Sequence, residues 1–409
     1  MEYGRRLGGF DRNERGVPFV LLAMAGVVCC WVWIAGLGYG AYPDTFKILR
    51  TWKVLVEYGM YQPSRFQGYL IPEMVLGFVA ANAGYAGSNG VVIVLGMATL
   101  SMVVVLLRDF VGNRQALLAA LFIAVNPYFV TIAAETSDYI FPFFFFFAGI
   151  LLLRRNALIL AGLAFACAVS SRLTFAPMGL SALVWQAWLV WHDRERWRTA
   201  MLAIAVFLMM SALFYLPVFI ASNMTLSFLT AAQPHEGYMA ARVVRFAYKQ
   251  VLLFGWIGSA CVVAVLAHGV WAWRRGRVEG LEQDGIRRLL WMCGAVILYT
   301  QCIFFGLPAR IVYLLPILAS LAVILAVLVR RPAVWVVLIG AEFLIWWVQP
   351  DIVRISYAET GSADCSMGTA IPTGMALAPH LRTGVIMQEV QDIPRAVCLL
   401  KTHYVEEFR

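Results

Sequence analysis

The stretch YPDTFKILRTWK, residues 42–53, stands directly behind the first long apolar run of the chain, residues 17–38. Its ionisable residues are Asp44, Lys47, Arg50 and Lys53. At about 100° per residue, Ile48, Leu49 and Trp52 share one side of a helix, and the charged side chains share the other. The pattern predicts a helix over residues 44–58 that lies on the membrane surface. Pro43 and Asp44 suit its first turn, where the helix dipole stabilises a carboxylate.

The rest of the chain is too apolar for an ordinary soluble domain. Of its 409 residues, 62% are hydrophobic and only 13% are charged, and runs close to the ~20 residues that cross a bilayer recur along it. They lie at about residues 17–38, 89–107, 115–131, 139–153, 157–171, 174–191, 199–220, 250–273, 289–305, 311–329 and 333–348. The sequence therefore predicts an all-α polytopic membrane protein with about eleven transmembrane helices.

Basic loops set the expected orientation. Arginines gather at residues 1–15, 108–114, 154–155, 193–198, 274–288 and 330–331, which is every second loop. Their excess over the acids in these loops equals the whole formal net charge of +9, and basic loops mark the cytoplasmic side. We expect a bacterial inner-membrane protein with a cytoplasmic N-terminus and an outer C-terminal tail. The charge indicates topology and gives no reason to expect a nucleic-acid partner.

The chain divides into a transmembrane domain, residues 1–348, and a small outer domain, residues 349–409. The first apolar run has no small-residue cleavage site and is expected to stay as an anchor. The outer loop 39–88 contains a second apolar piece, residues 70–84, which is expected not to cross, because a crossing would move the basic loops outside. Cys365 and Cys398 lie in the tail, where a disulfide and two free thiols are both open.

Ionisable side chains from separate outer loops lie near the ends of the predicted helices, where burial is costly and charge indicates function. The candidates are Asp44, Lys47, Arg65, Glu135, Asp138, Arg172, Arg242, Arg245 and Arg310. Cations suit the capture of an anionic lipid headgroup, and a carboxylate can take a proton from a hydroxyl. Glycosyl transfer from a polyprenyl phosphate needs both groups, and it passes through an oxocarbenium-like state as glycoside hydrolysis does.

Each candidate also has a simpler explanation. Asp44 and Asp138 can cap the helices that follow them. The surface cations can pair with lipid headgroups, and arginines at helix ends can extend to the interface. Glu342, the acid within the last predicted span, has either a buried partner or a functional role.

Several short motifs resemble the GT-C superfamily of glycosyltransferases, which includes the protein O-mannosyltransferases and the lipid A aminoarabinose transferases. These motifs are Asp44 behind the first span, SRFQGY at residues 64–69, NPY at 126–128, ETSD at 135–138 and Gly162 through Ser171-Arg172. The resemblance covers about residues 17–330. The chain departs from it in two ways: Thr45 follows Asp44 where many relatives have a second acid, and the outer tail is small.

The resemblance implies an inverting enzyme that moves a hexosyl or pentosyl group from a polyprenyl-phosphate donor to a glycan, lipid or protein acceptor. Asp44 would be the general base, Asp138 the acceptor-side acid and Glu135 a further catalytic candidate. The donor phosphate would be bound by Arg65, Lys47, Arg172, Arg242, Arg245 and Arg310. No metal or other cofactor is required, although a divalent cation at Asp44 and Asp138 stays open.

Two other functions compete with this interpretation. A ligase or polymerase of O-antigen type would use a diphosphate donor and have its largest outer loop late in the chain, whereas here the large loop comes first. A lipid-linked sugar flippase would have charges or broken helices at the membrane midplane. This chain has its charge at the helix ends, which favours the transferase.

Overall fold

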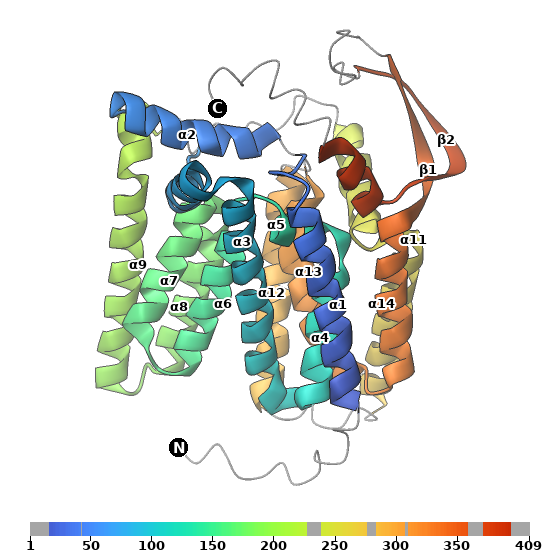
Figure 1. Cartoon of the computed structure of the whole chain (residues 1–409). Helices are drawn as coiled ribbons and strands as arrows, with labels where there is room; N and C mark the ends of the chain where they lie inside the picture. Colours follow the sequence, from blue (N-terminus) through green and yellow to red (C-terminus); the bar gives the residue numbers. More distant parts are fainter. Residues whose placement is uncertain are drawn as a thin grey trace.

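The computed structural model describes residues 16–41, 43–226, 239–275, 284–306, 310–358 and 371–393. Most helices run side by side, and α2 lies across one end of the bundle, here called the outer end (Figure 1). The elements are α1 (Val17–Ala35), α2 (Pro43–Tyr58), α3 (Leu70–Val111), α4 (Asn113–Val125), α5 (Pro127–Ala134), α6 (Ile140–Arg154), α7 (Leu158–Ser171), η2 (Leu173–Phe175), α8 (Ala176–Leu189), α9 (Arg194–Ala221), α11 (Met239–Arg274), α12 (Asp284–Gly306), η3 (Ile311–Leu314), α13 (Leu315–Leu328), α14 (Pro332–Trp347), β1 (Val348–Ala358) and β2 (Ile371–Thr383).

The described helices confirm the predicted polytopic helical architecture, to which the structure adds one two-stranded sheet. Six are long and apolar enough to cross a membrane, and a seventh span results if α4 and α5, bent by 77°, are counted together. Shorter apolar helices are formed by α6, by η2 with α8, by α7 and by α14. The number of crossings stays a prediction.

The interior is packed by aromatic and small side chains. Trp31 and Trp335 are fully buried, and the Trp31 ring lies 5.9 Å from that of Phe129. Gly162 of α7 touches the backbone of Ala203 in α9, so that a Cβ there would lie 2.4 Å from the Ala203 carbonyl oxygen. Close backbone approach at small residues is how helices associate in lipid.

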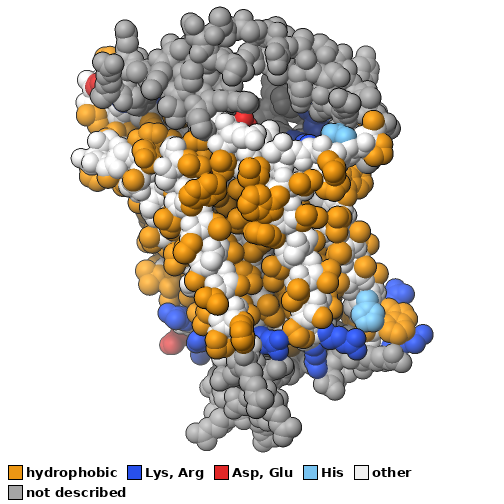
Figure 2. Space-filling view, turned by 45° about the vertical axis from the view of Figure 1, so that its right-hand side comes forward, with side chains coloured by type: hydrophobic (Ala, Val, Ile, Leu, Met, Phe, Trp, Pro, Cys, Tyr) orange, Lys and Arg blue, Asp and Glu red, His pale blue; other side chains and the backbone are white. Residues whose placement is uncertain are grey.

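Basic side chains gather at the end of the molecule opposite to the outer end. Figure 2 shows Lys and Arg side chains there, below a broad band of hydrophobic side chains. The arrangement agrees with the basic loops in the sequence, and such loops mark the cytoplasmic side. The orientation itself stays a prediction.

One glycine divides α3 into two parts. Gly84 has φ 62° and ψ −161°, which breaks the helix between residues 70–83 and 85–111. The first part packs under α2, because Gly77 allows Trp52 to come so close that a Cβ would lie 2.2 Å from the Trp52 Cβ. The 42 residues of α3 therefore form one candidate span with an extension at the outer end, and the expectation that residues 70–84 do not cross the membrane stays a prediction.

The NPY motif forms the bend between α4 and α5. The Asn126 side chain accepts hydrogen bonds from the backbone N–H groups of Tyr128 and Phe129 and so caps α5. Its amide donates to Glu342 Oε2 and to the Leu253 carbonyl, both at 2.8 Å. Glu342 thus has a buried partner, and the contact joins α4, α11 and α14.

The chain after α14 continues directly into a two-stranded antiparallel sheet. Val348 pairs with Thr383, and Ala358 pairs with Ile371. The hairpin extends beyond the outer end of the bundle (Figure 1), and a helix of residues 385–393 follows it. Cys365 and Cys398 lie outside the described residues.

Candidate active site

Asp44 lies in the first turn of α2 and faces the protein. It is 9% exposed, whereas Lys47 on the same helix is exposed. Its carboxylate contacts three cations: Lys47 Nζ lies 3.2 Å from Oδ1, and Arg65 Nη2 and Arg310 Nη1 lie 3.0 and 2.7 Å from Oδ2. The sequence predicted a polar face that ran the length of this helix. Its leading end is instead covered by other segments.

The electrostatics keep Asp44 ionised. Burial by itself would raise its pKa, but Arg65, Arg310 and Lys47 together outweigh that effect and hold the pKa below the ordinary value. A carboxylate close to several cations behaves in this way because each cation favours the charged form. Asp44 is therefore a charged acceptor at the meeting point of α2, the loop before α3 and the segment before η3.

Arg65 links the two aspartates of the site. Besides Asp44, it contacts Asp138 through both terminal nitrogens, Nη1 to Oδ2 and Nη2 to Oδ1, each at 3.3 Å. Its loop turns at Gly68, which has φ +63° and donates its backbone N–H to the Arg65 carbonyl at 2.8 Å. A planar guanidinium can hold two carboxylates in this way.

Arg172 is a buried cation that contacts Asp138. Arg172 is 3% exposed and Asp138 is 1% exposed, and Nη2 of Arg172 lies 3.0 Å from Oδ2 of Asp138. The guanidinium stacks on Tyr139, with Cζ 3.4 Å from the ring centre, and lies 5.2 Å from the rings of Tyr69 and Tyr313. These contacts occupy Arg172 within the protein.

The cations on the other side of Asp44 are more open to solvent. The side chain of Arg310 is 35% exposed, Arg245 of α11 is exposed and Lys249 is half-buried. Arg245 and Arg310 are the charges that act on Lys249, so three cations lie in one neighbourhood. In the described part of the chain, no hydrogen bond or ion pair joins Arg242 to Asp44 or Asp138.

Neutral side chains hold the two aspartate-bearing segments together. Thr45 Oγ1 donates to the Thr136 carbonyl at 2.8 Å, and Thr136 Oγ1 donates to Asn89 Oδ1 at 2.6 Å. The Asn89 amide in turn donates to the carbonyls of Ala35 and Gly38, at 2.9 and 2.7 Å. All three side chains are buried, so α1, α2, α3 and the loop before α6 share one network.

Glu135 faces away from this cluster. It packs on Gly40, where a Cβ would lie 2.4 Å from Glu135 Oε2. Burial raises its pKa well above the ordinary value, and the carboxyl of Glu389 raises it further. Burial also raises the pKa of Glu389, which accepts the Ala41 N–H at 3.1 Å. No described hydrogen bond or ion pair joins Glu135 to Asp44 or Asp138, and its catalytic role stays a prediction.

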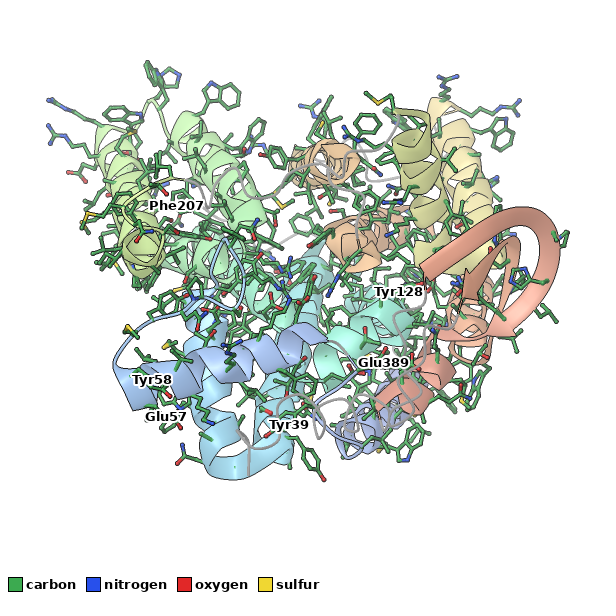
Figure 3. The ribbon with its side chains drawn as sticks, turned by 90° about the horizontal axis from the view of Figure 1, so that it is seen from above. Tyr39, Glu57, Tyr58, Tyr128, Phe207 and Glu389 are labelled. Carbon is green, nitrogen blue, oxygen red and sulfur yellow. The ribbon has the colours of Figure 1, made fainter. Side chains whose placement is uncertain are left out.

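Figure 3 views the molecule from the outer end. The helix α2 runs from Glu57 and Tyr58 at one edge toward the middle of the molecule, and Glu389 lies near its other end. The candidate residues of α2 are thus at the central end of the helix, and Glu57 is at the far end.

A small cavity of about 30 Å³ lies beside Arg172. Arg172, Tyr139 and Tyr313 line it together with Thr300, Phe304 and Pro316. Its walls come from α6, α8, α12 and α13 and from the short turns that contain η2 and η3.

The structure brings together Asp44, Lys47, Arg65, Asp138, Arg172 and Arg310 as the sequence interpretation expected. It adds Asn89, Tyr139 and Tyr313, and it gives contacts to Tyr69 and Thr136, which the sequence analysis named only as parts of the SRFQGY and ETSD motifs. These are neutral, and a search for ionisable side chains does not find them. Among the described residues, no three His, Cys, Asp or Glu side chains gather as a metal site would require, and the metal requirement stays a prediction.

Comparison with known protein families gives a match in sequence. Residues 76–220 match the family of dolichyl-phosphate-mannose-protein mannosyltransferases. No protein with a curated description matches the chain. The matched segment contains Asp138 and Arg172 and ends before α11.

Solved structures match over most of the chain. ArnT from Cupriavidus metallidurans bound to undecaprenyl phosphate aligns with a TM-score of 0.58 and 13% identity, over 80% of this chain and 62% of ArnT. Its apo state aligns with a TM-score of 0.55 and 17% identity, over 81% and 63%. The chain thus spans less than two thirds of the length of ArnT. The fold is that of the GT-C superfamily of integral-membrane glycosyltransferases, which the motifs had indicated.

Proposed function

We propose that the chain is a glycosyltransferase that moves one sugar from a polyprenyl-phosphate donor to an acceptor hydroxyl at the outer face of the membrane. The observation that carries the proposal is the position of Asp44, a buried carboxylate held by cations from three segments. The fold supports the proposal, and so does the polyprenyl phosphate bound in the ArnT structure. The sugar is a hexose or a pentose, and the acceptor a glycan, lipid or protein.

The donor phosphate binds on the open side of the cluster. Arg310 is one-third exposed in its side chain and lies with Arg245 and Lys249, whereas Arg172 is occupied by Asp138 and three tyrosines. Lys47 and Arg65 extend the cationic surface toward Asp44. Arg242, one turn before Arg245 on α11, can reach the outer part of the lipid headgroup.

The reaction is a single displacement. The bond between the anomeric carbon and the phosphate oxygen breaks, and the lipid phosphate leaves with the electron pair while nearby cations stabilise its charge. The acceptor oxygen attacks from the opposite side, and its proton passes to Asp44. The configuration at the anomeric carbon inverts, and Asp138 orients the acceptor side through Arg65.

A base with a lowered pKa fits this chemistry. The acceptor hydroxyl becomes acidic only as its bond to the cationic sugar forms, so proton transfer comes late. A bound phosphate also competes for Arg65 and Arg310, and with weaker ion pairs Asp44 is a stronger base. Binding of the donor phosphate would thereby raise the basicity of Asp44, the group that receives the proton.

The test is turnover of a lipid-phosphate sugar with a labelled sugar group by purified protein in vesicles, with a bacterial envelope extract added as the source of the acceptor that receives the label. We expect release of free polyprenyl phosphate with loss of label from the lipid, and at least a hundredfold lower rate for Asp44→Asn, about the contribution of a general base. Glu57→Gln, at the exposed far end of the same helix, is the matched control and should keep full rate.

Two results would oppose the proposal. Full activity of folded Asp44→Asn would remove the assigned base. Movement of the label across the membrane without release of polyprenyl phosphate would show flipping instead of transfer.

A further inference from the structure

The loop that contains Arg65 is hydrogen-bonded to one buried acid, Glu73. Residues 59–69 join α2 to α3 without helix or strand, and they are bracketed by Gly59 and Gly68, both with positive φ. Glu73, in the first turn of α3, is fully buried. All the side-chain hydrogen bonds described for Glu73 come from this loop.

The contacts fix the residue next to Arg65. Glu73 Oε1 accepts the backbone N–H of Ser64 at 2.9 Å and the Ser64 hydroxyl at 2.5 Å. Glu73 Oε2 accepts the Tyr61 hydroxyl. Ser64 is therefore held through both its backbone and its side chain.

The neighbours of Glu73 differ from those of the other site acids. Asp44 and Asp138 each contact arginines, whereas the described partners of Glu73 are neutral donors. Burial of a carboxylate without a cation is costly. The hydrogen bonds that Glu73 accepts hold the loop of residues 59–69 in one position. That loop places the guanidinium that joins Asp44 to Asp138.

We propose that Glu73 is a positioning residue for the transfer reaction, acting through Ser64 on Arg65. The expected effect on turnover rests on the proposed function. The expected effect on the order of the loop does not depend on that function. A guanidinium displaced by about 1 Å can lower a rate by about a hundredfold, so the fastening is expected to matter for turnover more than for folding.

The first experiment is a double-mutant cycle in the vesicle assay. We expect Glu73→Gln to lower turnover about a hundredfold and Ser64→Ala, which keeps the backbone N–H, to lower it less. In an Arg65→Ala background, Glu73→Gln should add almost nothing, because residues that act through one another are not additive. If the two losses multiply, Glu73 does not act through Arg65. Gln62→Ala, exposed in the same loop, is the control.

The second experiment measures the loop directly by hydrogen exchange of residues 59–69 in the full-length protein. We expect faster exchange in Glu73→Gln than in the wild type or in Gln62→Ala, with unchanged exchange in α13. Equal exchange in all three proteins would overturn the assignment. If Glu73→Gln fails to fold, Ser64→Ala and Tyr61→Phe each remove one bond and give the same comparison.

The two experiments separate the two proposals. Wild-type protein that releases no polyprenyl phosphate would contradict the transferase, and hydrogen exchange would still decide whether Glu73 orders the loop. Active wild-type protein with an additive cycle would contradict the positioning role alone.

Discussion

Glu135 and Asp138 are three residues apart, yet they belong to two buried groups with opposite surroundings. Asp138, with Asp44, lies among Arg65, Arg172 and other cations. Glu135 lies against Glu389, and the further charge that acts on this pair in the described part of the chain is that of Asp392. Among the described residues, the first group is rich in cations, whereas Glu135, Glu389 and Asp392 form an acidic group.

The difference shows that neighbours, more than residue type, determine what a buried carboxyl does. Cations favour the ionised form of Asp44. The first group can therefore accept a proton at Asp44 and bind an anion at its cations. Two adjacent carboxyls cannot both ionise cheaply, so the second group favours one retained proton. That pair joins the helix of residues 385–393 to the segment that leads into α2.

The largest expected difference is in stability. Asp138→Asn should lower the free energy of unfolding by about 3 kcal/mol, because it removes one partner of a buried ion pair. Glu135→Gln should change it by less than about 1 kcal/mol, because an amide resembles the protonated acid and can still hydrogen-bond to Glu389. Thermal unfolding in detergent, followed by circular dichroism, compares the two.

An equal loss in both variants would show that burial alone sets the cost of these substitutions. In that case the distinction between the two groups would have no energetic meaning.

A smaller difference should separate two arginines within the cation-rich group. Arg172→Lys should cost about 1–2 kcal/mol, because an ammonium group cannot stack on Tyr139 and bind Asp138 in the same geometry. Arg310→Lys, at a side chain that is 35% exposed, should cost under about 0.5 kcal/mol. Thermal unfolding in detergent measures both variants. Comparable losses would contradict the distinction between Arg172, which is buried, and Arg310, which is partly exposed.

The smallest effect is the dependence of stability on pH, which has opposite signs in the two groups. The pKa of Asp44 is lowered, so its contribution is present above its ordinary value of 3.8 and is lost as pH falls through the folded-state pKa. The pKa of Glu135 is raised, so its contribution is present below its ordinary value of 4.5 and is lost as pH rises through the folded-state pKa. A tenfold change in either acid dissociation constant on folding corresponds to about 1.4 kcal/mol of stability.

The unfolding midpoint should therefore decline as pH rises above the ordinary glutamate value of 4.5 and through the raised folded-state pKa of the pair, and Glu135→Gln or Glu389→Gln should flatten the decline. Glu57→Gln is the control, since it removes an exposed acid at the far end of α2 and leaves the pair intact. A wild-type midpoint that does not change over this range would show that the pair has no raised pKa.

Much of the cation-rich group was predictable from the sequence. The predicted topology places Asp44, Arg65, Asp138, Arg172 and Arg310 on one side of the membrane, and Asp138, Arg172 and Arg310 each lie at the end of an apolar segment. Ionisable groups at such positions need partners, so their convergence follows from physical chemistry. The membrane fold follows in the same way from long apolar runs.

The remaining features depend on side-chain direction and on distant segments. Glu135 ends α5 with extended backbone, φ −118° and ψ 156°, so no helical period tells which way it points. Its partner Glu389 comes from the tail, far along the chain. The tyrosines around Arg172 are as common in membrane interfaces as in sites, and they become visible as partners only in three dimensions.

The break at Gly84 has a consequence for where the chemistry takes place. A straight helix of 42 residues would be about 63 Å long, twice the ~30 Å of the hydrocarbon core. Its first 14 residues would stand roughly 20 Å out into water and take Glu73 and the Arg65 loop with them. Because one glycine folds this stretch back against α2, Glu73 and the Arg65 loop stay close to the ends of the apolar helices, where the proposed transfer would meet a donor that is held in the membrane.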